Sequence, residues 1–264
     1  MLPQEYDIMY RLENTYWWFA GMRGVTDRVL GPTIEAGSKL LDVGCGTGGR
    51  LEMLSRRCRT WGIDYHERAV DFCRRRGLEN IVQGDAGRLP YPDEMFSHAT
   101  CCEVLQNLND DFAGISEAFR VLQPGGLYYV SEQAYPILRS QHDVSQQAVR
   151  RYTRRRLKRL LTAAGFEIEL MTGANTILFP GLAAFRLASR VLHPPSRVNP
   201  EEARSNLSEL PGPVNLALRK LLDFEGKMIA SGRNLPFGLT IITLARKPVP
   251  EAAEVPPPGH KRQH

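Results

Sequence analysis

A short apolar segment that runs into a cluster of glycines is the part of this sequence best suited to hold a ligand. The segment covers residues 39–43, and Gly44, Gly46 and Gly49 follow it. Glycine has no Cβ, so it can adopt positive φ and let a ligand approach the backbone closely. A helix that begins directly after such a turn points its free amide groups at that ligand. We therefore expect a nucleotide-like cofactor to bind at this turn.

Carboxylates near the turn distinguish two classes of cofactor. The three glycines match the pattern G-x-G-x-x-G, and Asp64 lies 20 residues after Gly44, as in a dinucleotide-binding fingerprint. However, Asp42 stands two residues before Gly44, where a carboxylate would repel a pyrophosphate. S-adenosylmethionine carries a cationic amino group, a sulfonium and a ribose, but no phosphate. The position of Asp42 thus favours S-adenosylmethionine over NAD.

With Asp42 included, the turn resembles motif I of the class I S-adenosylmethionine-dependent methyltransferases, and the resemblance continues over residues 40–166. It is carried by the expected second strand at residues 60–64, the third at 80–86 and the fourth at 96–102. It continues through the turn at 121–126 into the expected fifth strand at 127–131. The resemblance implies that Asp64 binds the ribose. It also implies that the adenine lies beside Asp85, Ala86 and Leu89, with Asp85 accepting from the exocyclic amine. The expected role of Asp42 is indirect, in positioning the turn or the methionine amino group. The cofactor-binding residues that the resemblance implies in the core are Asp42, Gly44, Cys45, Gly46, Gly48, Asp64, Tyr65, Asp85, Ala86 and Cys102.

The same resemblance implies an α/β fold, a seven-stranded, mostly parallel, doubly wound sheet of the Rossmann-like methyltransferase type with an antiparallel last strand. Residues 37–173 would form the S-adenosylmethionine-binding core, with the last strand at 236–247. A lid at residues 1–36, helical but broken near Gly21, would precede the core. A Pro-rich tail at 248–264 is expected to be disordered.

An insertion at residues 174–235 separates the sixth strand from the last. Apolar stretches at 177–192 and 213–229 predict two helices, joined by a loop at 194–211. We favour a cap that folds over the ligand pocket. The alternative is a helix pair that docks peripherally on a membrane to reach a lipid-linked substrate.

Four adjacent aromatic residues at 16–19 belong to the expected lid. They cannot all face one side of a helix, so we expect some of them to cover a ligand. An aromatic-rich segment followed by an arginine resembles a subgroup of the same methyltransferases. This resemblance implies that Trp18 and Arg23 contact the cofactor, with Arg23 on a carboxylate such as that of its methionine part. Tyr16 and Trp17 would then line the acceptor site.

The subgroup resemblance also includes a His-Asp pair and an Arg-Arg-Tyr segment after the fifth strand. Methyl transfer needs a base only where the acceptor must lose a proton. The candidates are His142 with Asp143 as its orienter, and Glu103 after the fourth strand. Tyr135, Arg151 and Tyr152 would contact the acceptor.

Composition limits the other functions. The formal net charge is +5, from 34 basic and 29 acidic residues, which is too balanced for a polyanion-binding protein. The five cysteines show no metal-binding spacing, and neither a signal peptide nor a transmembrane run is evident, so we expect a metal-free cytoplasmic protein. A small-molecule or lipid-linked acceptor is therefore the first hypothesis. An RNA methyltransferase and a non-catalytic cofactor-binding protein are the alternatives, and the oligomeric state is left open.

Overall fold

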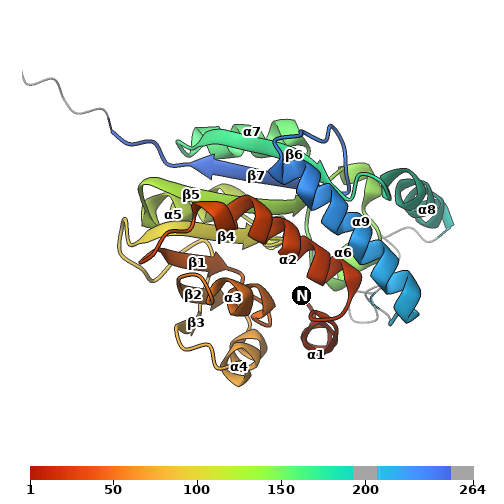
Figure 1. The fold of residues 1–264 in the computed structure, drawn as a ribbon, viewed down its shortest axis with the longest axis horizontal. Helices are drawn as coiled ribbons and strands as arrows, with labels where there is room; N and C mark the ends of the chain where they lie inside the picture. The colour runs from red at the N-terminus through yellow and green to blue at the C-terminus, as the bar shows by residue number, and fades with distance from the viewer. Residues whose placement is uncertain (193–206, 208, 251–264) are drawn as a thin grey trace, which may run out of the picture.

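The computed structural model describes residues 1–192, 207 and 209–250. Within this part of the chain, seven strands form one sheet in the order β3-β2-β1-β4-β5-β7-β6 (Figure 1). Neighbouring strands from β3 to β5 are parallel, whereas β7 is antiparallel to both β5 and β6. The predicted fold class is confirmed. The strands are β1 (Lys39–Val43), β2 (Arg59–Asp64), β3 (Ile81–Gln83), β4 (Phe96–Cys102), β5 (Leu122–Gln133), β6 (Glu167–Ala174) and β7 (Thr240–Arg246).

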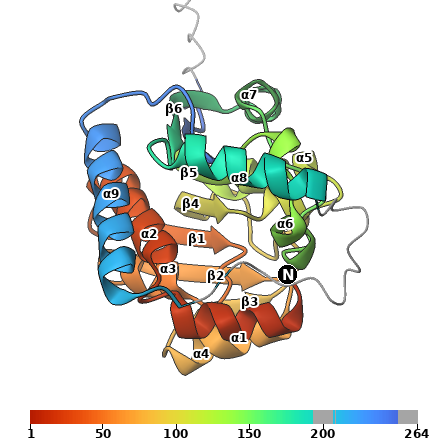
Figure 2. The same ribbon diagram turned by 90° about the vertical axis from the view of Figure 1, so that its right-hand side faces the viewer.

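Helices cover both faces of the sheet. Figure 2 shows α2, α3 and α9 on one side of it and α5 and α7 on the other. The α-helices are α1 (Pro3–Leu12), α2 (Trp17–Leu30), α3 (Gly49–Leu54), α4 (Glu67–Arg75), α5 (Asp111–Val121), α6 (Gln141–Ser145), α7 (Arg154–Ala163), α8 (Phe179–Leu192) and α9 (Gly212–Ala230).

Alternating side chains of the central strands build a separate apolar core on each face. In β1, Leu40 packs into the cluster that includes α2, α3 and α9, while Leu41 packs into the cluster that includes α5 and α7. Tyr129 and Tyr128 divide between the same two clusters in β5. Successive side chains of a strand point to opposite faces, so a sheet covered on both sides has continuous apolar strands. This arrangement holds the carboxyl ends of the strands in fixed register.

The break in the N-terminal helical region lies between α1 and α2, at residues 13–16, and not near Gly21 as predicted. Gly21 is instead inside α2, at its contact with α9. A Cβ at Gly21 would come within 2.6 Å of Leu222 Cδ1. The glycine therefore permits close helix packing and does not break the helix.

The two helices expected in the insertion are both present, and they contact different parts of the fold. Helix α9 packs along α2, where Asn215 Oδ1 accepts from the Trp17 amide at 2.8 Å and Arg28 pairs with Asp223. Helix α8 crosses the carboxyl ends of the strands (Figure 2). Among the described helices, none combines the length and the apolar character needed to cross a membrane. Most of the predicted loop at 194–211 and of the predicted tail at 248–264 lies outside the described residues.

Candidate functional site

A cavity of about 1270 Å³ opens at the carboxyl ends of the strands. Its walls come from the glycine-rich turn after β1, the ends of β2 and β4, helices α1 and α2, and helix α8. Pockets for one small ligand usually measure about 300–1,000 Å³. The cavity is therefore large enough for a cofactor and a second molecule together.

The turn after β1 presents its backbone to this cavity. Gly44 and Gly46 have φ of 70° and 56°, and both line the cavity together with Cys45. A Cβ at Gly44 would lie 2.1 Å from Val104 Cγ2, so this position has no room for a side chain. Gly48 departs from the prediction, because it caps α3 and lies against Leu78 and does not line the cavity.

Asp64 ends β2 at the cavity wall and braces the turn. One carboxylate oxygen accepts from the Gly46 amide at 2.9 Å, and the other accepts from the His66 amide at 3.0 Å and the Tyr6 hydroxyl at 3.2 Å. Burial and the neighbouring Asp64 raise the pKa of Tyr6, which keeps its hydroxyl protonated as a donor. Tyr6 also lines the cavity. The contribution of α1 here was not anticipated, because a single tyrosine on a helix carries no sequence signal for a ligand site.

Asp42 acts behind the cavity wall. Its carboxylate is fully buried and does not line the cavity, so it is not placed for direct contact with a ligand there. It accepts from Thr100 Oγ1 at 2.6 Å and lies 3.5 Å from the Arg50 guanidinium, and burial raises its pKa. Arg50 itself lines the cavity. The indirect role considered for Asp42 therefore takes a concrete form, in which Asp42 orients Arg50.

The walls after β2 and β3 include three of the residues predicted to contact the cofactor. Asp85, Ala86 and the exposed Tyr65 line the cavity, and Asp85 accepts from the Gly87 amide at 2.8 Å. Leu89 is buried in the apolar core and does not line the cavity, so the prediction of an adenine contact at Leu89 is corrected. Cys102, at the end of β4, also lines the cavity.

The aromatic segment of the lid lies over the same cavity. Tyr16, Trp17 and Trp18 all line it, and Trp17 also packs into the core beneath α2. Arg23 is a further lining residue, and its guanidinium donates to Asn14 Oδ1 at 3.4 Å. In the described structure, Arg23 thus contacts an amide and forms no ion pair with a carboxylate.

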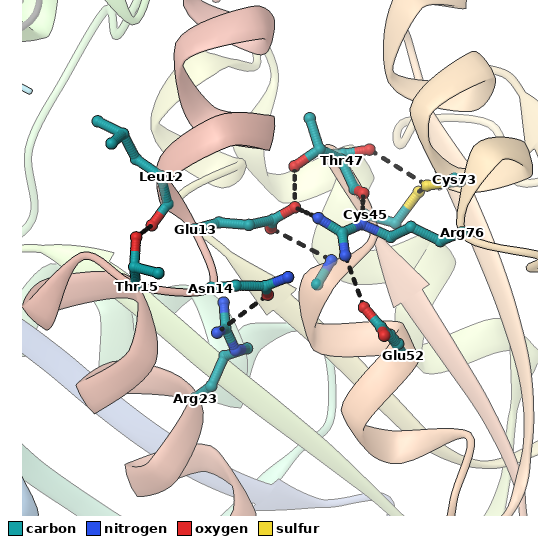
Figure 3. Close-up of polar contacts among 12 residues, drawn as sticks. Leu12, Glu13, Asn14, Thr15, Arg23, Cys45, Thr47, Glu52, Cys73 and Arg76 are labelled. Atoms are coloured by element: carbon teal, nitrogen blue, oxygen red, sulfur yellow. Dashed lines mark hydrogen bonds and ion pairs between the residues drawn. The ribbon is translucent and has the colours of Figure 1, made fainter.

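Glu13, between α1 and α2, fastens the lid to the glycine-rich turn (Figure 3). Its carboxylate accepts from Thr47 Oγ1 at 2.5 Å, from the Gly49 amide at 3.2 Å and from Arg76. Arg76 also donates to Glu52 at 2.6 Å and to the Thr47 carbonyl at 2.7 Å. The carboxylate occupies the start of α3, where the helix dipole and free amides favour negative charge. Sequence reasoning missed this cluster because its members come from four separate segments.

The two candidate bases also belong to the cavity wall. Glu103 follows β4 with φ of 59°, and burial raises its pKa to about 7. Its turn is held by the buried Glu132, which accepts from the Val104 and Leu105 amides at 3.1 Å and 2.9 Å. Burial, assisted by Arg186, lowers the pKa of His142 to about 4. Both candidates line the cavity, together with Arg186 of α8, which had not been predicted.

Four residues predicted at the acceptor end do not line the cavity. Asp143 accepts from Arg151 at 2.6 Å and 2.9 Å and caps α6 through Ser140, so it is not available to orient His142. The Tyr152 hydroxyl donates to Asp111 at 2.8 Å. The Tyr135 ring packs against α8, with its centroid 5.1 Å from that of Phe179. The predictions for Asp143, Tyr135, Arg151 and Tyr152 are thus corrected.

Among the described residues, no cluster of His, Cys, Asp and Glu side chains has the arrangement needed to hold a metal ion. The cavity wall brings together a backbone turn, two strand-end acids, two partly buried titratable groups and aromatic side chains of the lid. This arrangement suits a reaction between two bound molecules.

Comparison with known proteins finds a family match over part of the chain. Residues 41–130 match the family model described as "Methyltransferase domain". A demethylmenaquinone methyltransferase of Staphylococcus epidermidis is 34% identical over 113 residues, which are 40% of this chain and 47% of that protein. A fatty-acid O-methyltransferase of Mycolicibacterium smegmatis is 39% identical over 107 residues, which are 38% of either chain. The chain thus spans less than half the length of these two curated relatives.

A solved structure extends the comparison over nearly the whole chain. The crystal structure of the [4+2]-cyclase SpnF aligns with a TM-score of 0.56 and 25% identity, covering 93% of this chain and 94% of that one. The likeness therefore includes the segments outside residues 41–130.

Proposed function

We propose that this chain, which contains a methyltransferase domain of the class I fold with S-adenosylmethionine as its cofactor, transfers the methyl group to a small-molecule or lipid-linked acceptor. The observation that carries the proposal is one cavity whose wall includes the glycine-rich turn, Asp64, Asp85, Glu103 and His142. Its size accommodates the cofactor and an acceptor side by side.

The residues of the cavity divide between the two ligands. Asp64 would bind the ribose and Asp85 the adenine amine, with the backbone of Gly44 and Gly46 beside the cofactor. The cofactor supplies a methyl group activated by the sulfonium, and its leaving group is neutral. The protein then needs chiefly to align the acceptor atom with the methyl group and to exclude water. The aromatic lid at residues 16–19 is suited to the second task.

Glu103 fits the role of base better than His142. A general base works best when its pKa lies near the operating pH. Burial raises the pKa of Glu103 to about 7, whereas it lowers that of His142 to about 4. At neutral pH the His142 imidazole is neutral and binds protons weakly. For an acceptor that loses a proton, Glu103 would take it, and His142 would act in the pocket wall.

The finer features of the function remain part of this proposal. We include membership of the family subgroup that has an aromatic segment before Arg23 and the pair His142 and Asp143. The aromatic lid residues that line the cavity support this membership. Peripheral membrane contact through the insertion and a cytoplasmic location are predictions. Leu182 and Phe185 of helix α8 line the cavity. This position favours the interpretation of the insertion as a cap over the pocket, and not as a membrane-docking helix pair.

The proposal is tested by following the methyl group. The purified full chain is incubated with methyl-labelled S-adenosylmethionine and with separate small-molecule, lipid and RNA fractions of cell extract. We expect label in the small-molecule or lipid fraction, and none with the Gly46→Val variant. Label in the RNA fraction alone would support the RNA methyltransferase alternative.

A reaction without methyl transfer is the second candidate. It is favoured by the likeness over 93% of the chain to a structure whose name is that of a [4+2]-cyclase. In that case the cofactor would be bound but not consumed. Binding of S-adenosylmethionine with no label transferred to any fraction would overturn the methyl-transfer proposal in favour of this one.

A further inference from the structure

The cation Arg186 extends from the inserted helix α8 to the acceptor end of the cavity. It lines the cavity and has no hydrogen bond or ion pair within the described part of the chain. The other side-chain cations of the cavity have partners, since Arg23 contacts Asn14 and Arg50 contacts Asp42. A charge removed from water without a partner is costly. Burial and the nearby Arg151 accordingly lower the pKa of Arg186, to about 10.

The groups around Arg186 leave one positive charge without compensation. Arg151 is neutralised by its bidentate pair with Asp143. His142 is neutral at pH 7, because its pKa lies at about 4. Glu103 acts on Arg186 electrostatically, but no ion pair joins them, and with a pKa of about 7 it is partly protonated at neutral pH. The local charge therefore suits a ligand with a single negative charge.

The shape of the guanidinium further limits the class of anion that Arg186 would bind well. Its planar N–H groups match the two oxygens of a carboxylate, which they can bind in parallel. A phosphate monoester carries about two charges at neutral pH and would leave one of them unpaired here. The cavity wall offers a further polar contact at His142, whose Nδ1 is buried without a partner in the described structure and can donate to a carboxylate when it carries the proton.

We propose that the acceptor is a carboxylic acid whose carboxylate binds Arg186 in the cavity under helix α8. This inference rests on the proposed function only in assigning the bound acid the role of methyl acceptor. Binding of a carboxylate at Arg186 does not itself depend on methyl transfer. If the carboxylate is also the methylated group, one oxygen forms the O–CH₃ bond as the S–CH₃ bond breaks. The products are a neutral ester and S-adenosylhomocysteine, and no base is needed. If another atom is methylated, Arg186 acts as a specificity residue.

The test uses charge as the readout, so that a merely structural role of Arg186 can be recognised. The probes are straight-chain and aromatic monocarboxylic acids, each paired with its primary amide, and binding to the full chain is measured by calorimetry with S-adenosylhomocysteine present. The variants are Arg186→Gln and Arg186→Lys. The matched control is Arg219→Gln, which removes an exposed arginine of α9 that does not line the cavity.

We expect at least one acid to bind wild type more than tenfold tighter than its amide. Arg186→Gln should weaken that acid about 10- to 100-fold and leave its amide unchanged, because hydrogen bonds to charged groups are lost. Arg186→Lys should restore part of the preference, and Arg219→Gln should behave as wild type. Equal binding of acids and amides, no binding of any acid, or an acid preference that survives Arg186→Gln would overturn the proposal.

Two further measurements on the same variants distinguish failure of the carboxylate proposal from failure of the methyl-transfer function. S-adenosylmethionine binding is measured for every variant without any acid present. A chain that binds acids through Arg186 but does not bind S-adenosylmethionine would contradict the methyl-transfer function and leave the carboxylate site intact. A chain that methylates neutral molecules equally well with and without Arg186 would contradict the carboxylate proposal alone.

Discussion

The substitution Glu13→Gln tests whether the lid is fastened to the glycine-rich turn by a buried charge. The Glu13 side chain is 3% exposed and its partner Arg76 is 7% exposed, so the pair is desolvated. The change keeps the shape of the side chain but removes its charge. It weakens the contacts with Arg76, with Thr47 Oγ1 and with the Gly49 amide, which begins α3 (Figure 3).

The size of the effect follows from these contacts. Breaking a buried ion pair usually costs about 3–5 kcal/mol. Arg76 retains Glu52 and the Thr47 carbonyl as acceptors, so we expect the low end, a loss of about 3 kcal/mol in the free energy of unfolding. For a chain of this size that lowers Tm by about 6–12 °C. The assay is thermal and urea unfolding of both proteins.

Glu52→Gln is the matched control. Glu52 contacts the same arginine at 2.6 Å, but its side chain is 41% exposed. Exposed ion pairs contribute about 1 kcal/mol or less. We therefore expect a small change for Glu52→Gln beside a large one for Glu13→Gln. Equal losses in the two variants, or no loss in Glu13→Gln, would refute the reasoning that burial makes this lid contact strong.

Two further predictions concern the cavity. Gly46→Val should lower the affinity for S-adenosylmethionine at least tenfold while circular dichroism stays unchanged, because φ is 56° and the added Cβ would lie 3.0 Å from Met9 Cε; loss of the fold itself would make this glycine purely structural. Glu103 has an ordinary pKa of 4.5 that burial raises to about 7, so its stabilising contribution is complete below about pH 4.5 and is lost as pH rises through 7. Urea unfolding should accordingly show wild type losing stability relative to Glu103→Gln between about pH 5 and pH 7, and a difference that does not vary with pH would contradict the burial of this acid.

The order and type of the core elements could be predicted because their signals are local. Strand β4 has the predicted bounds of 96–102, and the glycine-rich turn lies where residues 44–46 indicated. The acids at 64 and 85 follow strands, and parallel strands bring their carboxyl ends to one edge. Residue type and position along the chain therefore brought Asp64 and Asp85 to the cavity wall, whereas Asp42, Gly48 and Leu89 do not line it.

The acceptor end could not be predicted to the same degree, because its side chains are shared among distant segments. Asp143 and Arg151 look like site residues in the sequence, but each is the other's buried partner. Arg186 looks like an ordinary helix arginine, and only the path of α8 across the strand ends brings it to the cavity (Figure 2). Pairing of buried charges is decided by tertiary contacts, which no local pattern reports.

The most direct test of the central claim is a calorimetric titration of the full chain with S-adenosylmethionine, compared between wild type and Asp64→Asn. Asp64 ends β2 at the cavity wall and is expected to accept from the ribose hydroxyls, with each charge-assisted bond contributing about 1.5–3 kcal/mol. The account predicts saturable binding to wild type, at least tenfold weaker binding to Asp64→Asn, and no comparable binding of NAD. Equal affinity of the two proteins for S-adenosylmethionine, or a preference of wild type for NAD, would contradict it.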